Sequence, residues 1–577
     1  MSTEQLAAVE LNTKEDFENY NIREKLKKAQ RPFDYYKHIK NLDYEQLADS
    51  DRYFLQDFGI YNNSLNDEEF MLRLRFPAGR ISSEQLKSIS NICNKYDLTI
   101  ILTARAGMQL HGLEAHNVYE AYKAVEEANM NTWQSFGDNV RNITTDIFDG
   151  IGKHNIIEVY PYIEQMQEYI LKNPEYVGLL PRRLSIGISG SYANGSSFFA
   201  SDIYFALAKK DDIYGFNVYL GGKNTEIAQD ANIFLKKEEI LDFYKTIIRV
   251  FYIHGLRLDR ERNRLYHLLE EIGIEKFVSL LQEDYKSVFN SKGDIQLQKV
   301  EFEDFNELKD GTYSFCYHSK FAKIEASEVL NISNYCQKHN LEARIGTDQQ
   351  LYILNLKENK IDLKHDNINR TIVACAGSEY CPYAYWTIKD EVQYLPLEKI
   401  QKNKILVGFS GCLRGCAKHE HADIGLVGLK SNYLGNREKT ARIYLGGLYT
   451  EGKALARKVF TTIPLTNLKE ILEIIIEEYE NSTYKTFESF SENIINKYSV
   501  KFLNLWVLAK FKTKKKVYLD SFNEIEILNK YFGDLESIKN CSNDFDSAIK
   551  LLSKELWIYK ESKEDAKLNK TYVMMIE

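Results

Sequence analysis

Four cysteines stand in two pairs in the second half of the sequence. The stretch ACAGSEYCPYA contains Cys375 and Cys381, and GCLRGC contains Cys412 and Cys416. Zinc sites usually combine tighter spacings with histidine, whereas the glycines beside three of these thiols would let the backbone approach a bulkier inorganic group. The spacing therefore favours a [4Fe-4S] cluster. A structural zinc site and four unrelated buried cysteines are the alternatives that the spacing leaves open.

The remaining cysteines and the N-terminal stretch bear on the compartment of the protein. The other four of the eight cysteines, Cys93, Cys316, Cys336 and Cys541, are scattered along the chain. The N-terminal stretch has neither the basic nor the apolar region of a secretion signal, and no stretch reaches the roughly 18 apolar residues that span a bilayer. We therefore expect a cytoplasmic protein without a disulfide framework and without a membrane partner.

Composition limits the classes of function. The 577 residues are 44% hydrophobic and 27% charged, which is typical of a folded protein with several domains. The formal net charge of -8 argues against general binding of nucleic acid, which needs a dense cationic surface. The basic run KFKTKKK at 510–516 is expected to be a solvated surface.

The first of two internal repeats predicts a small unit of strand, helix and strand. RISSEQLKSISNICNKYDL at 80–98 aligns without a gap with KIEASEVLNISNYCQKHNL at 323–341. Both stretches have apolar residues at helical spacing, and alternating segments precede and follow each of them. Cys93 and Cys336 occupy the same position in the two copies, so both are expected to be small core residues.

The second repeat carries the clustered thiols in only one copy. RLSIGISGSYANGSSFFASDIYFAL at 183–207 aligns with KILVGFSGCLRGCAKHEHADIGLVG at 404–428. Cys412 and Cys416 replace a serine and a glycine of the first copy. The thiols are therefore not needed merely to close this loop.

Together these features resemble the siroheme-dependent nitrite and sulfite reductases. FGIY, MLRLRFPAG, QLHG, DNVRN, LPRR and ADIGLVG follow the order and the intervals of that family, and the resemblance covers about residues 58 to 500. It implies an α+β, internally duplicated fold, with a pseudo-two-fold arrangement of two ferredoxin-like half-units and two larger α/β units that bind siroheme and the cluster. The expected divisions are an N-terminal arm (1–65), a ferredoxin-like half-domain (66–130), an α/β substrate and siroheme domain (131–300), a second ferredoxin-like half-domain (301–370), an α/β [4Fe-4S] and siroheme domain (371–500) and a C-terminal helical extension of unknown role (501–577).

The resemblance also implies roles for the thiols. Cys375, Cys381, Cys412 and Cys416 would hold the [4Fe-4S] cluster. Cys416 would in addition be the axial ligand that joins the cluster to the siroheme iron.

Four residues correspond to catalytic positions of the family. Arg73 and Arg141 match arginines that bind the substrate. Arg183 stands where the family usually has lysine, and Ser185 stands where sulfite reductases have a second lysine and nitrite reductases tend to have asparagine. A guanidinium hardly deprotonates, so Arg183 is a poorer proton donor than lysine.

Four further residues are expected to bind the siroheme carboxylates. Arg75 is two residues from Arg73, which in a strand places both on one face. Arg105, Gln109 and His111 are expected to alternate along a strand toward the macrocycle.

The resemblance implies a six-electron reduction of a small anion, nitrite to ammonia or sulfite to sulfide. Ser185 favours nitrite slightly. No motif for a dinucleotide or flavin is present, so the electrons are expected to come from a ferredoxin or a flavoprotein partner. The alternative is a non-catalytic iron-sulfur electron carrier or redox sensor, for which buried arginines would have no purpose.

Overall fold

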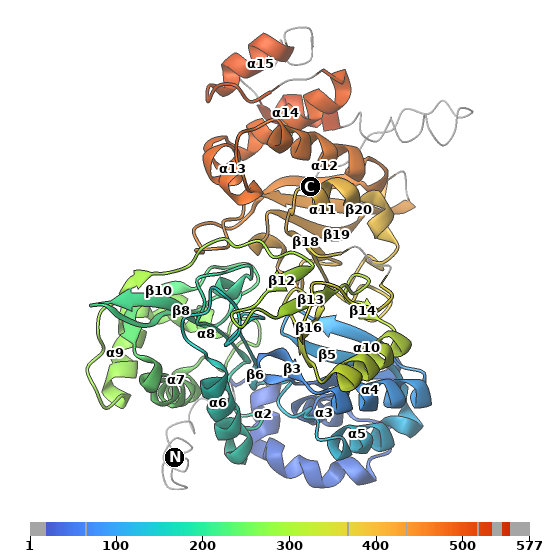
Figure 1. Cartoon of the computed structure of the whole chain (residues 1–577), viewed down its shortest axis with the longest axis vertical. Helices are drawn as coiled ribbons and strands as arrows, with labels where there is room; N and C mark the ends of the chain where they lie inside the picture. Colours follow the sequence, from blue (N-terminus) through green and yellow to red (C-terminus); the bar gives the residue numbers. More distant parts are fainter. Residues whose placement is uncertain are drawn as a thin grey trace. The chain divides into compact units, whose positions relative to one another are not determined.

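The computed structural model describes residues 19–63, 66–365, 369–433, 436–515, 518–532 and 545–553. The chain divides into two compact units, the first up to Asn367 and the second from Ile368. Both units combine helices with strands, and the fold is α+β (Figure 1). In the described part of the chain, every helix is too short or too polar to cross a membrane.

Two five-stranded sheets with the same strand order lie in the first unit. One sheet is β1 (Ile60–Asn63), β2 (Asn66–Leu74), β5 (Gly107–Glu114), β4 (Thr99–Thr103) and β14 (Lys323–Ile324). The other sheet is β12 (Phe305–Glu307), β13 (Tyr313–Tyr317), β16 (Leu351–Leu356), β15 (Glu342–Ile345) and β3 (Arg80–Ile81).

Each of these sheets takes its fifth strand from the other half of the repeat. β14 pairs with β4, and β3 pairs with β15, both antiparallel. The sequence pattern predicted a helix from residues 80 and 323 onward, but the first two residues of each stretch form these exchanged strands. The exchange is reciprocal, as the predicted pseudo-two-fold arrangement of the half-units requires.

The two helices that follow the exchanged strands pack on each other, as Figure 1 shows for α4 (Ser83–Tyr96) and α10 (Ala326–His339). The hydroxyl of Ser90 on α4 donates to the carbonyl of Ala326 (2.7 Å), and Ser333 on α10 donates to Ser83 (2.7 Å). Cys93 and Cys336 are buried in the same core, which confirms their predicted place. The helix pair therefore repeats this hydrogen bond about a local two-fold axis.

Two larger sheets share a second topology. From one edge, two parallel pairings are followed by two antiparallel pairings in each sheet. The sheet in the first unit is β6 (Val140–Thr144), β7 (Leu184–Ser189), β8 (Ile203–Lys210), β9 (Ile213–Leu220) and β10 (Gln229–Leu235), with β11 (Asp294–Ile295) on β8. The sheet in the second unit is β17 (Ile372–Ala374), β18 (Val407–Ser410), β19 (Ile424–Tyr433), β20 (Asn436–Leu445) and β21 (Arg457–Pro464).

Each of these two sheets has a buried aspartate that accepts the same backbone hydrogen bond. Asp202 accepts the backbone N–H of Ser185 (2.8 Å), and Asp423 accepts that of Leu406 (2.9 Å). These are equivalent positions in the two copies of the repeat. The structure therefore confirms the internal duplication at the level of single hydrogen bonds.

The remaining helices surround the sheets. In the first unit they are α2 (Ile22–Ala29), α3 (Asp49–Leu55), α5 (Val118–Glu127), α6 (Tyr160–Lys172), α7 (Ile240–His254), α8 (Leu265–Ile272) and α9 (Ile274–Asp284). In the second unit they are α11 (Leu397–Lys402), α12 (Leu465–Glu480), α13 (Phe487–Asn493), α14 (Val500–Thr513), α15 (Glu524–Phe532) and a further helical segment at 545–553. The buried apolar faces of α6 and α7 close the core of the first large sheet.

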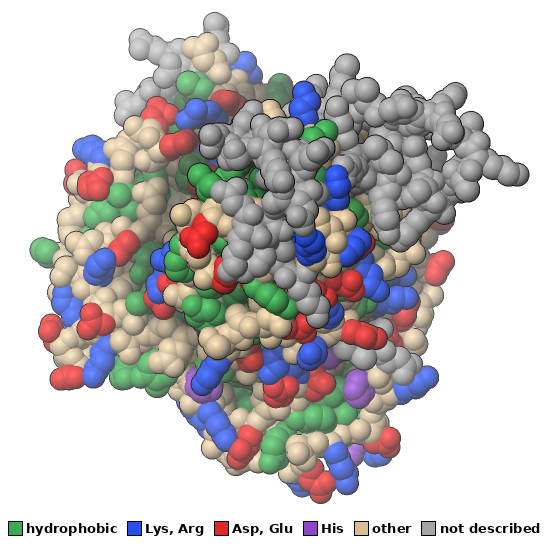
Figure 2. All heavy atoms as spheres, turned by 90° about the horizontal axis from the view of Figure 1, so that it is seen from above, with side chains coloured by type: hydrophobic (Ala, Val, Ile, Leu, Met, Phe, Trp, Pro, Cys, Tyr) green, Lys and Arg blue, Asp and Glu red, His purple; other side chains and the backbone are tan. Residues whose placement is uncertain are grey.

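The basic run at 510–516 is only partly a solvated surface. Lys510 is buried on α14, with its ammonium 3.7 Å from the carboxylate of Glu478 and 5.2 Å from the ring of Trp506. Lys512, Lys514 and Lys515 are exposed. Figure 2 shows acidic and basic side chains interspersed over the described part of the face in view.

Removing either cross-helix hydroxyl is expected to destabilise the first unit equally. Ser90→Ala and Ser333→Ala each remove one cross-helix hydrogen bond, so each should lower the free energy of unfolding by about 1 kcal/mol; Ser90→Ala also removes a long bond from the side chain of Asn94 (3.4 Å), which adds little. The shift of the thermal transition of the two variants measures this. A cost for one variant and none for the other would contradict the two-fold equivalence of the contacts.

Candidate functional site

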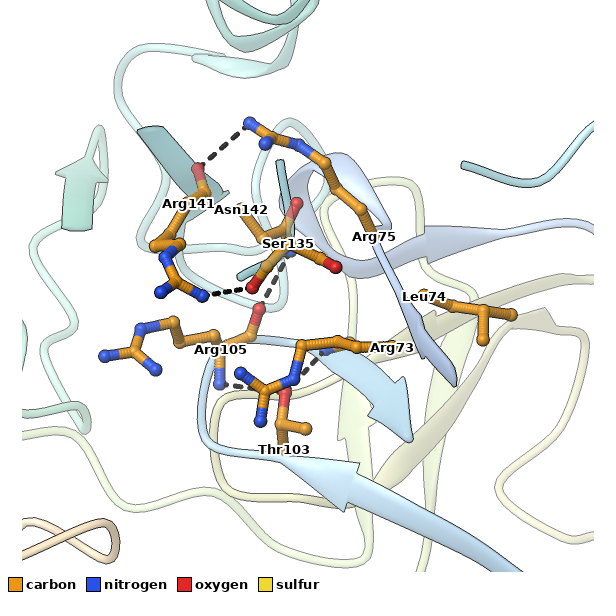
Figure 3. A pocket seen from close by; sticks show the side chains of 9 residues that line it. Arg73, Leu74, Arg75, Thr103, Arg105, Ser135, Arg141 and Asn142 are labelled. Atoms are coloured by element: carbon orange, nitrogen blue, oxygen red, sulfur yellow. Dashed lines mark hydrogen bonds between the residues drawn. The ribbon is translucent and has the colours of Figure 1, made fainter. Parts of the chain in front are cut away.

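A pocket in the first unit gathers arginines from three separate segments of the sequence. Its walls come from the end of β2, the turn between β4 and β5, the loop before β6 and the start of β6. Figure 3 shows the guanidinium groups of Arg105 and Arg141 ending on one side of the pocket, while that of Arg75 points away from them. The lining residues are Arg73, Leu74, Arg75, Thr103, Arg105, Gly107, Ser135, Arg141 and Asn142.

Arg141 is buried among other cations. Its terminal nitrogens donate to the carbonyl of Ser135 and to that of Gly137 (2.9 Å). Burial and the charges of neighbouring arginines, Arg183 first among them, hold the pKa of Arg141 well below its usual range. The buried Nε atoms of Arg141 and Arg183 have no acceptor among the described residues. Two such N–H groups in a crowd of positive charge fit an anionic ligand.

Arg73 is held by its neighbours on the adjacent strand. It lies opposite Gln109 in the pairing of β2 with β5. With its amide turned to accept from Arg73, Gln109 places its oxygen 3.1 Å from Nε of Arg73 and its nitrogen 3.3 Å from Nε2 of His111. Nδ1 of His111 lies 3.8 Å from the carboxylate of Glu69. Gln109 and His111 therefore orient Arg73 in this structure.

Arg75 follows the last residue of β2, forms an isolated β-bridge with Asn131 and lines the same pocket as Arg73. Its buried guanidinium donates to the side chain of Gln167 (2.7 Å) and to the carbonyls of Val140 (2.7 Å) and Arg141 (2.9 Å). All three of its nitrogens are thus engaged by the protein. Arg75 clamps the strand that carries Arg141.

Arg105 lies in the turn between β4 and β5, not on a strand that it shares with Gln109 and His111. Ala106 has a φ of 52°, which marks the tight turn. The side-chain nitrogen of Asn142 donates to the carbonyl of Arg105 (2.8 Å) and so ties this turn to β6. Arg105 reaches the cationic crowd from the turn.

Arg183 and Ser185 have different surroundings. Burial and the charge of Arg264, then of other arginines, hold the pKa of Arg183 well below its usual range. The hydroxyl of Ser185 donates to Asp202 (2.6 Å), whose carboxylate also accepts from Arg264 (2.6 Å). Arg183 is therefore part of the cluster of buried arginines, whereas the hydroxyl of Ser185 is hydrogen-bonded to the carboxylate of Asp202.

Phe136 is a pocket neighbour that the sequence did not single out. Its ring centre lies 3.8 Å from the guanidinium carbon of Arg73 and 5.5 Å from that of Arg141. The ring also stacks with Tyr61, with 5.1 Å between the centroids. Phe136 stands two residues before the motif that contains Arg141, but a single aromatic residue in a loop gives no signal of its own.

The four thiols lie in the second unit, in the segments that follow two parallel strands, β17 and β18. Cys375 comes directly after β17, and Cys412 comes shortly after β18. The N–H of Gly411 donates to Sγ of Cys375 (3.1 Å). Burial raises the pKa of Cys381 and of Cys412, and backbone N–H groups oppose this shift. Such donors favour the thiolate, which is the form that binds metal.

The thiols also act on one another. Burial raises the pKa of Cys375 to about 12, and the thiol of Cys416 adds to the shift. Cys416 raises the pKa of Cys381 and Cys412 as well, and is itself exposed. The described residues contain no group of three or more His, Cys, Asp and Glu placed to hold a metal ion. Thiolates around a cube of four irons stand further apart than thiolates around one ion.

Gly411 has no room for a side chain. A Cβ there would lie 2.9 Å from Cβ of Ala384 and 3.3 Å from Sγ of Cys375. The equivalent Gly190 of the first repeat is closed too, since its Cβ would lie 1.9 Å from the carbonyl oxygen of Ile157. Both copies therefore need glycine here, and in the second copy the close approach is to a thiol.

Comparison with known proteins gives two family matches. Residues 64–128 match the family described as "Nitrite/Sulfite reductase ferredoxin-like half domain". Residues 136–289 match the "Nitrite and sulphite reductase 4Fe-4S domain". The second match covers β6 to β10 of the first large sheet together with Arg141 and Arg183, and it contains none of the four clustered cysteines.

Curated relatives and a solved structure extend the similarity over most of the chain. A ferredoxin–nitrite reductase of Synechococcus elongatus is 25% identical over 77% of this chain and 93% of its own length. A chloroplastic ferredoxin–nitrite reductase of Arabidopsis thaliana is 24% identical over 77% of this chain and 82% of its own length. The fold is similar to that of the NirA protein of Mycobacterium tuberculosis, with a TM-score of 0.75 and 20% identity over 83% of this chain and 97% of that one.

Asp57 is a fully buried carboxylate beside the loop that holds Arg141. Its Oδ1 accepts from the side chain of Asn139 (2.7 Å), and its Oδ2 has no partner among the described residues. A Cβ on Gly137 would lie 2.1 Å from Oδ1, so the loop packs directly on the carboxylate. Burial and the nearby charge of Asp138 raise the pKa of Asp57 to about 7.

The substitution Asp57→Asn is expected to change how stability depends on pH. The folded protein keeps the proton on Asp57 up to about pH 7, whereas the unfolded chain releases it near pH 4. This contribution to stability is fully present below about pH 4 and is lost as the pH rises to about 7, at a limiting slope of about 1.4 kcal/mol per pH unit. Urea unfolding between pH 5 and 8 should therefore show that the free energy of unfolding of the variant rises relative to that of the wild type as the pH rises. A constant difference would contradict the raised pKa.

Proposed function

Because the chain belongs to the nitrite and sulfite reductase family, we propose that it reduces a small oxyanion, with nitrite as the preferred substrate. The reduction takes six electrons and yields ammonia from nitrite or sulfide from sulfite. The observation that carries the proposal is the crowd of guanidinium groups in which Arg141 and Arg183 keep buried N–H groups without an acceptor. Such a crowd destabilises the empty pocket and is relieved when an anion binds.

The cofactors are siroheme and a [4Fe-4S] cluster. Cys375, Cys381, Cys412 and Cys416 would hold the cluster, and Cys416 would also bind the siroheme iron. The donor set fits this role because the N–H of Gly411 points at Sγ of Cys375 and because the thiols lie close enough to shift one another's pKa. When bound, the two cofactors supply the redox chemistry and pass electrons that arrive singly to the substrate.

The arginines bind and orient the anions. In the proposal, Arg73 and Arg141 hold the substrate, while Arg105 and Arg183 bind carboxylates of the siroheme. Their fixed positive charges favour the more negative form of the bound anion, as preorganised donors do. Gln109 and His111 act on the site through Arg73.

Arg75 and Ser185 are positioning residues in this proposal. Arg75 donates to the carbonyl of Arg141 and sets the position of the strand behind the pocket. Ser185 and Asp202 fix the start of β7, directly after Arg183. Proton supply then falls to bound water, since neither the guanidinium of Arg183 nor the hydrogen-bonded hydroxyl of Ser185 is a good donor.

A ferredoxin is the proposed electron donor. The curated relatives that match most of the chain are named for ferredoxin as well as for nitrite. A reducing compartment such as the cytoplasm is part of the proposal, because the four thiols have to stay reduced until they bind the cluster.

The absorption spectrum of the purified protein tests the cofactors, and turnover with a reduced dye tests the substrate. We expect bands of siroheme together with iron and sulfide for one cluster per chain, and a higher kcat/KM for nitrite than for sulfite. A cluster without siroheme would favour the electron carrier. Bands of siroheme without turnover of either anion would contradict the enzymatic proposal.

The substitution Arg73→Gln is expected to weaken anion binding more than it slows the chemical step. It removes a charge-assisted hydrogen bond of about 1.5–3 kcal/mol, so KM for nitrite should rise about 10- to 100-fold. Steady-state kinetics with a reduced dye measure this rise. An unchanged KM would exclude Arg73 from the substrate site.

The substitution Gly411→Ala is expected to lower the iron content per chain severalfold. Its Cβ would press on Ala384 and on the thiol of Cys375. Gly195→Ala is the matched control, because it lies in the equivalent loop of the first repeat and its Cβ would have 4.0 Å of clearance from the carbonyl of Val300. Equal iron contents of the two variants, determined by metal analysis, would contradict the packing argument.

A further inference from the structure

We propose that Phe136 is a positioning residue that sets the separation of Arg73 and Arg141 and thereby the affinity of the pocket for its anion. The inference rests on the proposed function, because it takes these two arginines as the groups that bind the substrate. It adds a residue that belongs to none of the sequence motifs and whose side chain carries no charge.

The ring of Phe136 serves two cations at once. The guanidinium carbon of Arg73 lies 3.8 Å from the ring centre, and that of Arg141 lies 5.5 Å from it. Both distances are within the range in which an aromatic face attracts a cation. The charge of Arg73 is also among the causes that lower the pKa of Arg141, so two guanidinium groups that both contact this ring repel each other.

An aromatic ring can hold two arginines together without lowering the positive charge of the pocket, which an acidic residue would do. A carboxylate between two arginines would hold them but would also cancel the charge that attracts an anion. The quadrupole of a ring attracts both cations and leaves their net charge in place. Phe136 can therefore keep the arginines together while the pocket stays fully positive for its ligand.

The backbone around Phe136 is fixed, so the ring has a defined place. Its carbonyl accepts from the side chain of Asn139 (2.8 Å). The carbonyls on either side of it, those of Ser135 and Gly137, both accept from Arg141. Gly137 has a φ of 65° and packs on Asp57, so this turn depends on glycine. The loop is thus built around Arg141, with the ring directed at Arg73.

Loss of the ring is expected to weaken nitrite binding more than it lowers kcat. In the holoenzyme, Phe136→Leu keeps an apolar side chain but removes both cation contacts, so the dissociation constant of nitrite should rise about tenfold with a smaller change in kcat. The constant is read from the shift of the siroheme bands as nitrite is titrated, and KM and kcat are measured separately. Phe136→Tyr keeps the ring and should restore the affinity of the wild type.

Tyr160→Leu is the matched control. Tyr160 lies outside the pocket lining, and its ring centre is 3.6 Å from the guanidinium carbon of Arg80. This variant loses a cation contact of the same kind, and its affinity for nitrite should stay that of the wild type. Thermal unfolding of all variants shows any general loss of structure.

The outcomes separate this inference from the proposed function. Nitrite binding without turnover, weakened by Phe136→Leu alone, would overturn the reductase and support the role of Phe136. Normal turnover with equal affinities in the wild type and Phe136→Leu would overturn the role of Phe136 and leave the reductase in place. Weakening by Phe136→Leu and Tyr160→Leu alike, or no rescue by Phe136→Tyr, would also overturn the role of Phe136.

Discussion

The repulsion among buried guanidinium groups is the constraint that shapes the first unit. Arg141 and Arg183 lie where burial and neighbouring arginines both disfavour their charge. Such a crowd is stable only if rigid acceptors hold each member, because unpaired buried charge is costly. Carbonyls of the 135–137 loop hold Arg141, and the carbonyls of Val140 and Arg141 hold Arg75. These acceptors are neutral, so they stabilise the cations and leave the pocket positive.

The sequence predicted those parts of the site that depend on local patterns. The cysteine pairs and the two repeats are visible as spacing and identity, and the structure has the duplicated fold that they implied. The sequence did not show how the guanidinium of Arg75 would be held, because its acceptors on α6 and β6 come from distant segments. The prediction that Arg105 alternates along a strand with Gln109 and His111 was wrong. Arg105 lies in a turn, because β4 ends at Thr103 and β5 begins at Gly107.

Other features could not be read from the sequence because distant segments create them. The exchanged strands are two residues long and stand at the start of a helical pattern, where periodicity carries no signal for a strand. Gln167 and Phe136 acquire their roles only when a helix and a loop meet the arginines. The two duplicated sheets likewise combine a feature that both copies keep with a feature that differs between them. Asp202 and Asp423 keep one backbone contact in both copies, whereas the loops after β7 and β18 have diverged to hydroxyl and thiol chemistry.

The reciprocal exchange of β3 and β14 has a consequence for synthesis on the ribosome. The contact from Ser90 to Ala326 joins residues 236 positions apart, and the first sheet lacks its outer strand until β14 has been made. At about 5–20 residues per second, the open edge of β4 waits for tens of seconds before its partner emerges. An unpaired edge invites pairing with other nascent chains. The first sheet can therefore close this edge only after most of the first unit has been translated.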